Sequence, residues 1–322
     1  MRYKLLIGII AGMVLSGCQG TRSVDELPLA VCIKAPLPNE VDRFCEFMQD
    51  RLAKDGVSTI VLLIRYNYQF TSHPECSAKA ALTLADAKKL TSTARKSGIT
   101  IIPKMNLMGH QSVKHCPVEE GILKAYPDMD ESRARGKLLY DYCHCLCPRH
   151  PDSARIACEL MDELVDAFEA KAIHIGCDEV FEIGFCERCE GVKTAKLFAD
   201  WVNMLARHNA SRGVETLIWA DRLLNAKDTG YGIWEASDNG TDEAINLIDK
   251  SIILCDWHYE KCKRYPSVEI FAKAGFRFWL CPWRYLENAQ TFITSAMEAE
   301  NDHALGIMLT TWCSFSDDSE VA

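Results

Sequence analysis

The chain has 322 residues, of which 48% are hydrophobic and 25% are charged, and its formal net charge is −9. This is the composition of an ordinary globular protein, and the length is sufficient for one large core or two small ones. The acidic balance argues against a nucleic-acid partner, because proteins that bind the phosphate backbone present a basic surface.

The first eighteen residues have the features of an export signal rather than of a folded element. Arg2 and Lys4 precede an apolar segment that is too short to span a bilayer comfortably. The sequence LSGC, which ends at Cys18, resembles the lipobox of bacterial lipoproteins; the alternative is an ordinary or uncleaved signal peptide. We expect 1–18 to be a lipoprotein signal peptide and 19–27 a polar tether. Lipid on Cys18 would then hold the protein at the bacterial cell envelope, on its periplasmic or outer-surface side.

The rest of the chain alternates apolar, strand-like segments with amphipathic helical patterns. The strand-like segments are 27–36, 57–68, 99–110, 171–180, 215–224, 251–260, 276–285 and 304–315. The second is nearly continuously apolar, as expected of a strand that is covered on both faces. Between the segments, apolar residues recur three or four positions apart, and Thr83 with Asp86 predicts a capping box at the start of one helix.

Eight such segments with helices between them predict an α/β fold, a (β/α)8 TIM barrel over residues 28–322. The alternative, an open doubly wound sheet, usually carries a glycine-rich phosphate-binding turn after its first strand, and this sequence has none there. No low-complexity block or long linker interrupts the pattern, which favours one domain. Because the sequence stops soon after the eighth segment, we expect the last helix to be incomplete or missing.

In such a barrel, functional side chains lie at the C-terminal ends of the strands. The fourth segment ends on two adjacent acids, Asp178 and Glu179, and the fifth ends on Trp219 and Asp221. Other segments end on further polar and aromatic residues: Arg65, Asn106, His110, Trp257, Tyr259, Trp283 and Trp312. Tryptophans and acids at one rim favour a carbohydrate cleft, because sugars stack their C–H faces on aromatic rings and bond carboxylates through their hydroxyls.

For Asp178 and Glu179 to act together, both side chains must face the pocket. Alternation along a strand places His174, Gly176 and Asp178 on the same face. If that face lines the barrel, Glu179 points away from the pocket unless the chain has already begun to turn. A shared role for Asp178 and Glu179 therefore requires a turn at this point.

The stretch HIGCDEV (174–180) resembles the His-x-Gly-x-Asp-Glu signature of family 20 glycoside hydrolases, the β-N-acetylhexosaminidases. The similarity is greatest to the hexosaminidase D-like branch, and further stretches support it: IIPKMNLMGH, CPRHP, IWADRLL, CDWHYE and TTW. The resemblance implies a (β/α)8 catalytic barrel that removes terminal N-acetylglucosamine or N-acetylgalactosamine from glycans. It also implies exo-acting, substrate-assisted retaining hydrolysis with no cofactor and no catalytic metal.

The same resemblance assigns roles to the two acids. Glu179 would protonate the leaving oxygen and then activate water, for which burial and the neighbouring charge would have to raise its pKa. Asp178 would stay ionised, orient the 2-acetamido group of the substrate and stabilise the oxazolinium intermediate.

Eight further residues are expected to bind the substrate or to support the acids. Tyr259 matches a tyrosine that bonds the acetamido oxygen, and the aromatic cage would comprise Trp219, Trp257, Trp283 and Trp312. His110 and His174 would support the acids, although His174 could equally be a core histidine. Asp221 would bond sugar hydroxyls, with a plain surface role as the alternative. One departure concerns the arginine that many members carry on strand one, where this chain offers only Lys34; whether Arg65 replaces it is open.

Cysteines gather in the segments expected at the same rim: Cys116, Cys143, Cys145, Cys147, Cys186 and Cys189. A structural zinc site, disulfides and free thiols are equally compatible with this pattern. Two functions besides hydrolysis remain. The missing strand-one arginine and the short C-terminus suggest a non-catalytic glycan-binding lipoprotein on the same barrel, and the cysteines suggest a metal-sequestering envelope protein.

Overall fold

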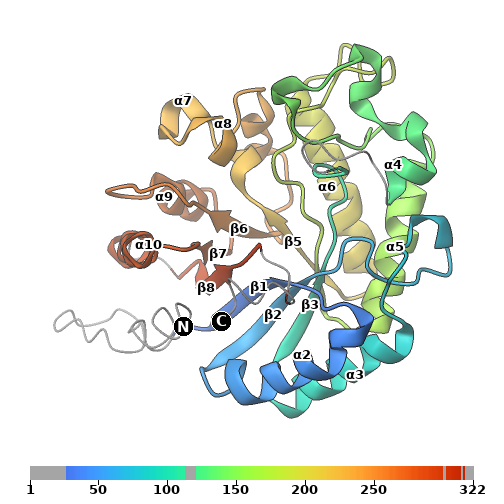
Figure 1. The fold of residues 1–322 in the computed structure, drawn as a ribbon. Helices are drawn as coiled ribbons and strands as arrows, with labels where there is room; N and C mark the ends of the chain where they lie inside the picture. Colours follow the sequence, from blue (N-terminus) through green and yellow to red (C-terminus); the bar gives the residue numbers. More distant parts are fainter. Residues whose placement is uncertain (1–26, 113–120, 300–301, 313–314, 316–322) are drawn as a thin grey trace.

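The structure, a computed structural model, describes residues 27–112, 121–299, 302–312 and 315. Its centre is a closed barrel of eight parallel strands in chain order, from β1 to β8 (Figure 1). The strands are β1 Leu29–Lys34, β2 Val57–Leu63, β3 Thr100–Lys104, β4 Ala172–His174, β5 Glu215–Trp219, β6 Ile253–Trp257, β7 Phe278–Cys281 and β8 Ala304–Thr310. The predicted (β/α)8 TIM barrel is confirmed, and each strand falls within the segment predicted for it.

Helices surround the barrel, with α2, α3, α5 and α6 around the lower and right sides of Figure 1 and α9 and α10 on the left. The α-helices are α2 Val41–Phe47, α3 Leu84–Lys96, α4 Ile122–Ala125, α5 Ser153–Ala167, α6 Thr194–Ser211, α7 Ala226–Thr229, α8 Gly232–Glu235, α9 Pro266–Lys273 and α10 Leu286–Glu298. A π-helical turn, Met48–Leu52, continues α2. Short 3-10 turns lie at Pro38–Glu40, Pro74–Cys76, Pro127–Met129, Glu131–Arg135, Leu139–Asp141, Asp221–Leu223 and Thr241–Asn246.

The predicted capping box of α3 is present. The Thr83 hydroxyl accepts the backbone N–H of Asp86, and the Asp86 carboxylate accepts the backbone N–H of Thr83 at 2.9 Å. Before β6 the chain forms the 3-10 turn Thr241–Asn246. It follows Gly240, whose φ of 84° is left-handed, and only a few residues separate it from β6, which leaves no room for a longer helix.

Alternation along the strands divides the core into two layers. Ala30 and Cys32 of β1 pack inside the barrel with residues such as Met308 of β8. Val31 and Ile33 of the same strand join the larger apolar layer between the strands and the helices. Because both faces are covered, the strands are apolar throughout, which is why the sequence pattern identified them.

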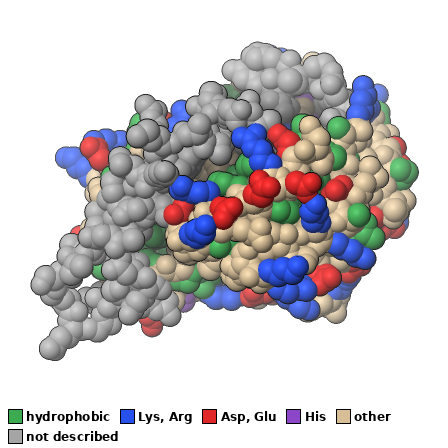
Figure 2. Space-filling model, turned by 60° about the horizontal axis from the view of Figure 1, so that its bottom comes forward, with side chains coloured by type: hydrophobic (Ala, Val, Ile, Leu, Met, Phe, Trp, Pro, Cys, Tyr) green, Lys and Arg blue, Asp and Glu red, His purple; other side chains and the backbone are tan. Residues whose placement is uncertain are grey.

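The signal peptide, the tether and Cys18 lie outside the described residues, as do most positions after Trp312 on which the last helix depends. Within the described part of the chain, no helix is both long and apolar enough to cross a membrane. On the face that Figure 2 shows, basic and acidic side chains are interspersed rather than gathered into one basic surface.

Candidate active site

A pocket of about 1140 Å³ opens at the C-terminal ends of the strands. Eight of the ten residues predicted for catalysis or substrate binding line it: His110, Asp178, Glu179, Trp219, Trp257, Tyr259, Trp283 and Trp312. The other two, His174 and Asp221, are buried behind its wall.

The chain turns into the pocket directly after β4. The strand ends at His174, and Gly176 and Cys177 then adopt φ values of 74° and 69°. Glu179 itself has a φ of 48°, in the left-handed region that non-glycine residues rarely occupy. The requirement for a turn is therefore met, and both acids face the pocket instead of alternating across a strand. Non-glycine residues in a left-handed backbone conformation are strained, and such strain is common at active sites.

Two close approaches fix the position of this turn. A Cβ atom on Gly176 would lie 2.8 Å from the Asn106 Oδ1 atom, and one on Gly109 would overlap the Asp178 carbonyl oxygen. The backbone N–H of Leu107 also donates to the Ile175 carbonyl at 3.0 Å. The segment after β3 thus packs against the turn so tightly that only glycine fits at these two contacts.

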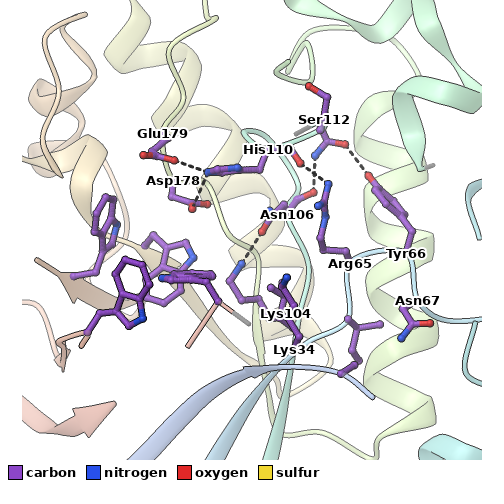
Figure 3. A pocket seen from close by; sticks show the side chains of 18 of the residues that line it. Lys34, Arg65, Tyr66, Asn67, Lys104, Asn106, His110, Ser112, Asp178 and Glu179 are labelled. Atoms are coloured by element: carbon purple, nitrogen blue, oxygen red, sulfur yellow. Dashed lines mark hydrogen bonds and ion pairs between the residues drawn. The ribbon is translucent and has the colours of Figure 1, made fainter. Parts of the chain in front are cut away.

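His110 joins the two acids. Its Nε2 atom lies 2.7 Å from Glu179 Oε2 and 3.2 Å from Asp178 Oδ2, as the dashed lines in Figure 3 show. The Nδ1 atom on the other side of the ring lies 3.4 Å from the Cys143 sulfur. The predicted support of the acids by His110 is thus a direct contact with both carboxylates.

The charges in this group set each other's proton affinities. Burial disfavours the imidazolium, but the Asp178 carboxylate, together with Cys143 and Glu179, raises the pKa of His110 well above its usual range. Burial likewise opposes the Asp178 carboxylate, yet His110 and Lys104 together lower the pKa of Asp178 below its usual range. Near neutral pH the pair is therefore an imidazolium beside a carboxylate.

We expect Asp178→Asn to lower the pKa of His110 toward its ordinary value of about 6.5, because the largest attraction on the imidazolium is removed. In the wild type, the stability that this ion pair contributes is present between the lowered pKa of Asp178 and the raised pKa of His110. It is lost as the pH rises through the pKa of His110, or falls through that of Asp178. NMR titration of labelled histidine measures the shift; a His110 pKa that is unchanged in the variant would contradict this account.

Asp221 lies behind the acids, not in the pocket, so its predicted contact with sugar hydroxyls is not what the structure shows. Its Oδ2 atom accepts the Glu179 backbone N–H at 2.9 Å and the Arg222 Nε–H at 2.6 Å. Its Oδ1 atom accepts the Trp257 indole N–H at 3.2 Å. Burial, opposed by Arg222, raises the pKa of Asp221 to about 6. Asp221 is therefore a positioning residue for Glu179 and Trp257.

Asp221→Asn should lower the free energy of unfolding by about 3–5 kcal/mol, because it leaves the Arg222 guanidinium, which is 0% exposed, without its counter-charge. Urea denaturation measures the change. Asp200→Asn is a matched control, since it breaks an exposed ion pair with Lys196 whose loss should cost about 0.3–0.5 kcal/mol. Equal effects of the two substitutions would show that Asp221 does not hold the site together.

Aromatic side chains form the wall of the pocket at the ends of β5 to β8, and in Figure 3 aromatic rings lie across the pocket from Arg65 and Tyr66. The Trp219 and Trp312 rings lie 5.7 Å apart, and the Tyr259 ring lies 4.9 Å from Trp257 and 5.0 Å from Trp283. The Trp312 indole N–H donates to the Tyr259 hydroxyl at 3.0 Å, which orients that hydroxyl. The predicted aromatic cage is thus assembled around one tyrosine.

His174 is fully buried and does not line the pocket, in agreement with the alternative of a core histidine rather than a substrate contact. Its Nδ1 atom accepts the Gly176 backbone N–H at 3.0 Å, and its ring packs 4.6 Å from Trp219. Burial and Lys104 lower the pKa of His174 well below its usual range, so the ring is neutral. It helps to fix the turn that carries the acids.

Several pocket residues were not predicted from the sequence. Lys104, at the end of β3, is 1% exposed and donates to Asn106 Oδ1 at 2.6 Å. Tyr142 and Trp234 come from the connections after β3 and β5, and their rings lie 5.0 Å apart. The signal for Lys104 was a lone cation at the end of an apolar segment, whereas nothing in the sequence marks the other two. Lys34 and Arg65 both line the pocket, and Arg65 donates to the His110 carbonyl at 3.0 Å.

The sequence matches one family model and several known proteins. Residues 57–322 match the family model described as glycosyl hydrolase family 20, catalytic domain. A lacto-N-biosidase of Bifidobacterium bifidum is 24% identical over 204 residues, which cover 58% of this chain and 17% of that protein. A β-hexosaminidase of Vibrio furnissii is 23% identical over 218 residues, which cover 65% of this chain and 31% of that protein. The chain spans less than a third of the length of these relatives.

Solved structures show the same barrel. The chitobiase of Flavobacterium johnsoniae has a TM-score of 0.61 at 19% identity, with 88% of this chain and 44% of that chain covered. An exo β-N-acetylglucosaminidase from Vibrio harveyi, solved in complex with N-acetylglucosamine, has a TM-score of 0.61 at 15% identity, with 90% and 50% covered. At these identities the likeness shows the fold.

Proposed function

We propose that this chain, which belongs to family 20 of the glycosyl hydrolases, is an exo-acting β-N-acetylhexosaminidase that removes terminal N-acetylglucosamine or N-acetylgalactosamine from glycans. The observation that carries the proposal is the pair Asp178 and Glu179, which face one pocket and both contact His110. Exo action is proposed because Lys104 and Trp219, which line the pocket, are almost fully buried on strands β3 and β5 of a closed barrel, so the substrate would enter from the rim.

Glu179 acts as the proton donor in this proposal. As the acetamido carbonyl oxygen of the substrate attacks C1, the bond from C1 to the glycosidic oxygen breaks and that oxygen takes the Glu179 proton. His110 Nε2, 2.7 Å from Glu179 Oε2, positions the carboxyl group for this transfer. In the second step Glu179 accepts a proton from water as the water oxygen attacks C1. The oxazolinium ring opens and the product keeps the β configuration.

Asp178 stabilises the cation that forms between the two steps. Its pKa is lowered by His110 and Lys104, so it keeps its charge throughout. Its Oδ2 atom faces His110, whereas Oδ1 is buried and accepts no hydrogen bond from the described residues. The Asp178 carboxylate, which lines the pocket, would accept the acetamido N–H of the substrate, and its charge would stabilise the positive oxazolinium ring.

The aromatic wall would hold the acetamido group and the sugar ring. The Tyr259 hydroxyl, oriented by Trp312, would donate to the acetamido oxygen, and the surrounding indoles would enclose the methyl group. On the opposite side, Lys34 and Arg65 are the cations that would bond sugar hydroxyls, in place of a single arginine on the first strand.

The test is release of nitrophenol from 4-nitrophenyl N-acetyl-β-glucosaminide and N-acetyl-β-galactosaminide by the purified protein. We expect turnover of at least one of them, and the ratio of the two rates gives the sugar preference. Absence of turnover combined with N-acetylhexosamine binding by calorimetry would overturn hydrolysis in favour of a glycan-binding barrel.

We also propose that lipid on Cys18, which lies outside the described residues, holds the protein at the bacterial cell envelope. The support is the sequence LSGC after an apolar segment. Cys18→Ala should move the protein out of the membrane fraction after cell lysis. Membrane association that survives the substitution would contradict anchoring at this residue.

A further inference from the structure

A second cluster of reactive side chains lies beside the pocket but is not part of it. It consists of Glu131, Cys147, Cys186 and Cys189, all of them buried. Glu131 and Cys147 belong to the long connection after β3, and the two other cysteines belong to the connection after β4. Of the six rim cysteines considered from the sequence, Cys116 lies outside the described residues. The structure brings Cys147, Cys186 and Cys189 together and leaves Cys143 against His110 and Cys145 in the core.

The four ligand atoms are spaced as a tetrahedral metal site requires. The Cys147 sulfur lies 3.3 Å from the Cys186 sulfur and 3.7 Å from the Cys189 sulfur, and Cys189 Sγ lies 3.4 Å from Glu131 Oε2. A tetrahedral zinc ion with Zn–S bonds of about 2.3 Å holds sulfur ligands about 3.8 Å apart. A disulfide would need about 2.05 Å between two sulfurs and would leave the third cysteine and the carboxylate unused.

The cluster also contains a buried acidic side chain, Glu131, with no basic partner among the described residues. Glu131 is 0% exposed, and no lysine, arginine or histidine in the described part of the chain forms an ion pair with it. Its Oε1 atom accepts the backbone N–H groups of Phe185 and Cys186 at 2.7 and 3.1 Å. These bonds fix the carboxylate so that Oε2 points to the sulfurs, as surrounding hydrogen bonds commonly do for metal ligands. A buried carboxylate among thiols is costly unless a cation is bound.

We propose that Glu131 and the thiolates of Cys147, Cys186 and Cys189 bind one structural zinc ion. Thiolate-rich tetrahedral sites with Cys-x-x-Cys spacing, here Cys186 and Cys189, are typical of zinc. All four positions are taken by protein, so the ion has no open position for substrate and takes no part in the hydrolysis.

The ion would tie together the two connections that build the catalytic rim. The connection after β4 carries Asp178 and Glu179, and the connection after β3 carries His110 and Tyr142. Between these segments, Glu131 already accepts the backbone N–H groups of Phe185 and Cys186. Within the connection after β3, the Cys147 backbone N–H bonds the Met129 carbonyl at 2.7 Å, which places Cys147 near Glu131. A cross-link at this place would hold the two acids and His110 in register.

Metal analysis of the full chain, purified without added metal or thiol reductant, tests the proposal. By inductively coupled plasma mass spectrometry we expect about one zinc per chain in the wild type. In the double variant Cys186→Ser/Cys189→Ser the zinc content should fall below about a tenth of an ion per chain. Cys158→Ser, a half-buried cysteine of α5 outside the cluster, is the matched control and should retain the metal. Zinc retained by the double variant, or a wild type without metal whose Cys147 is joined to another cysteine in peptide mapping, would overturn the site.

A second measurement covers the case in which the double variant does not fold. Treating the wild type with a thiol-specific mercurial should release the zinc, and exchange with cobalt(II) should produce thiolate-to-cobalt charge-transfer absorption. Chelation should also lower the melting temperature, and zinc should restore it. Cobalt bound without a thiolate band would overturn thiolate ligation.

Discussion

Glu179→Gln should lower kcat by about 10²–10⁴-fold for aryl N-acetylhexosaminides with poor leaving groups. The amide keeps the size of the side chain but cannot give a proton to the departing oxygen. A leaving group as acidic as 2,4-dinitrophenol departs without protonation, so the loss on that substrate should be much smaller. Steady-state kinetics over a series of substituted phenyl glycosides measures the dependence of the loss on the leaving group.

The pattern, rather than the loss alone, identifies the proton donor. A variant that is merely misfolded would lose activity on every substrate to the same extent. Glu298→Gln removes an exposed carboxylate at the end of α10 and should leave the whole series unchanged. A loss in Glu179→Gln that does not depend on the leaving group would contradict the assignment.

Asp178→Asn should lower kcat by about 10²–10³-fold on every substrate of the same series, whatever the leaving group. Asparagine can still accept the acetamido N–H, but it carries no charge to stabilise the oxazolinium ring. Because this effect arises at the acetamido group, it does not depend on how readily the phenol departs. The two substitutions therefore differ in the slope of rate against leaving-group acidity.

Asp302→Asn, at an exposed position before β8, is the control for Asp178→Asn and should leave kcat unchanged. The His110 titration in the same variant provides an independent check, because the lost charge must also lower the pKa of that imidazole. A kcat near that of the wild type, in a variant whose His110 pKa has fallen, would show that the Asp178 charge is not needed for the reaction.

The barrel could be predicted from the sequence because its strands are covered on both faces. Each strand is a short apolar segment, and a parallel barrel places the residues that follow the strands at one rim. That geometry placed Trp219, Trp257, Trp283 and Trp312 around one pocket before any contact between them was known. Asp178 and Glu179 were found in the same way, together with the resemblance carried by HIGCDEV.

The orientation of the acids could not be predicted, since it depends on backbone angles and not on residue types. Strand alternation would have turned Glu179 away, and left-handed angles at Gly176 and Cys177 reverse that outcome. The place of Asp221 was missed for a related reason. Its position two residues after Trp219 indicates the rim, but whether the carboxylate faces sugar or the Glu179 backbone depends on the 3-10 turn that begins there.

The grouping of the cysteines could not be predicted from the sequence either. Cys-x-x-Cys marks two partners, but Glu131 lies more than fifty residues away in a connection without regular strands. Long connections of this kind are placed by tertiary contacts rather than by local patterns. Tyr142 and Trp234 reach the pocket from such connections too.

The central claim is that the acetamido group of the substrate is the nucleophile, with Asp178 beside it and Glu179 beside the leaving oxygen. The most direct test compares the aryl N-acetyl-β-hexosaminide that the protein cleaves with the matched aryl β-hexoside that carries a hydroxyl instead, while proton NMR follows the first anomer released. The account predicts cleavage of the acetamido substrate alone, with the β-anomer appearing first. Comparable cleavage of the hydroxyl substrate, or first release of the α-anomer, would contradict it.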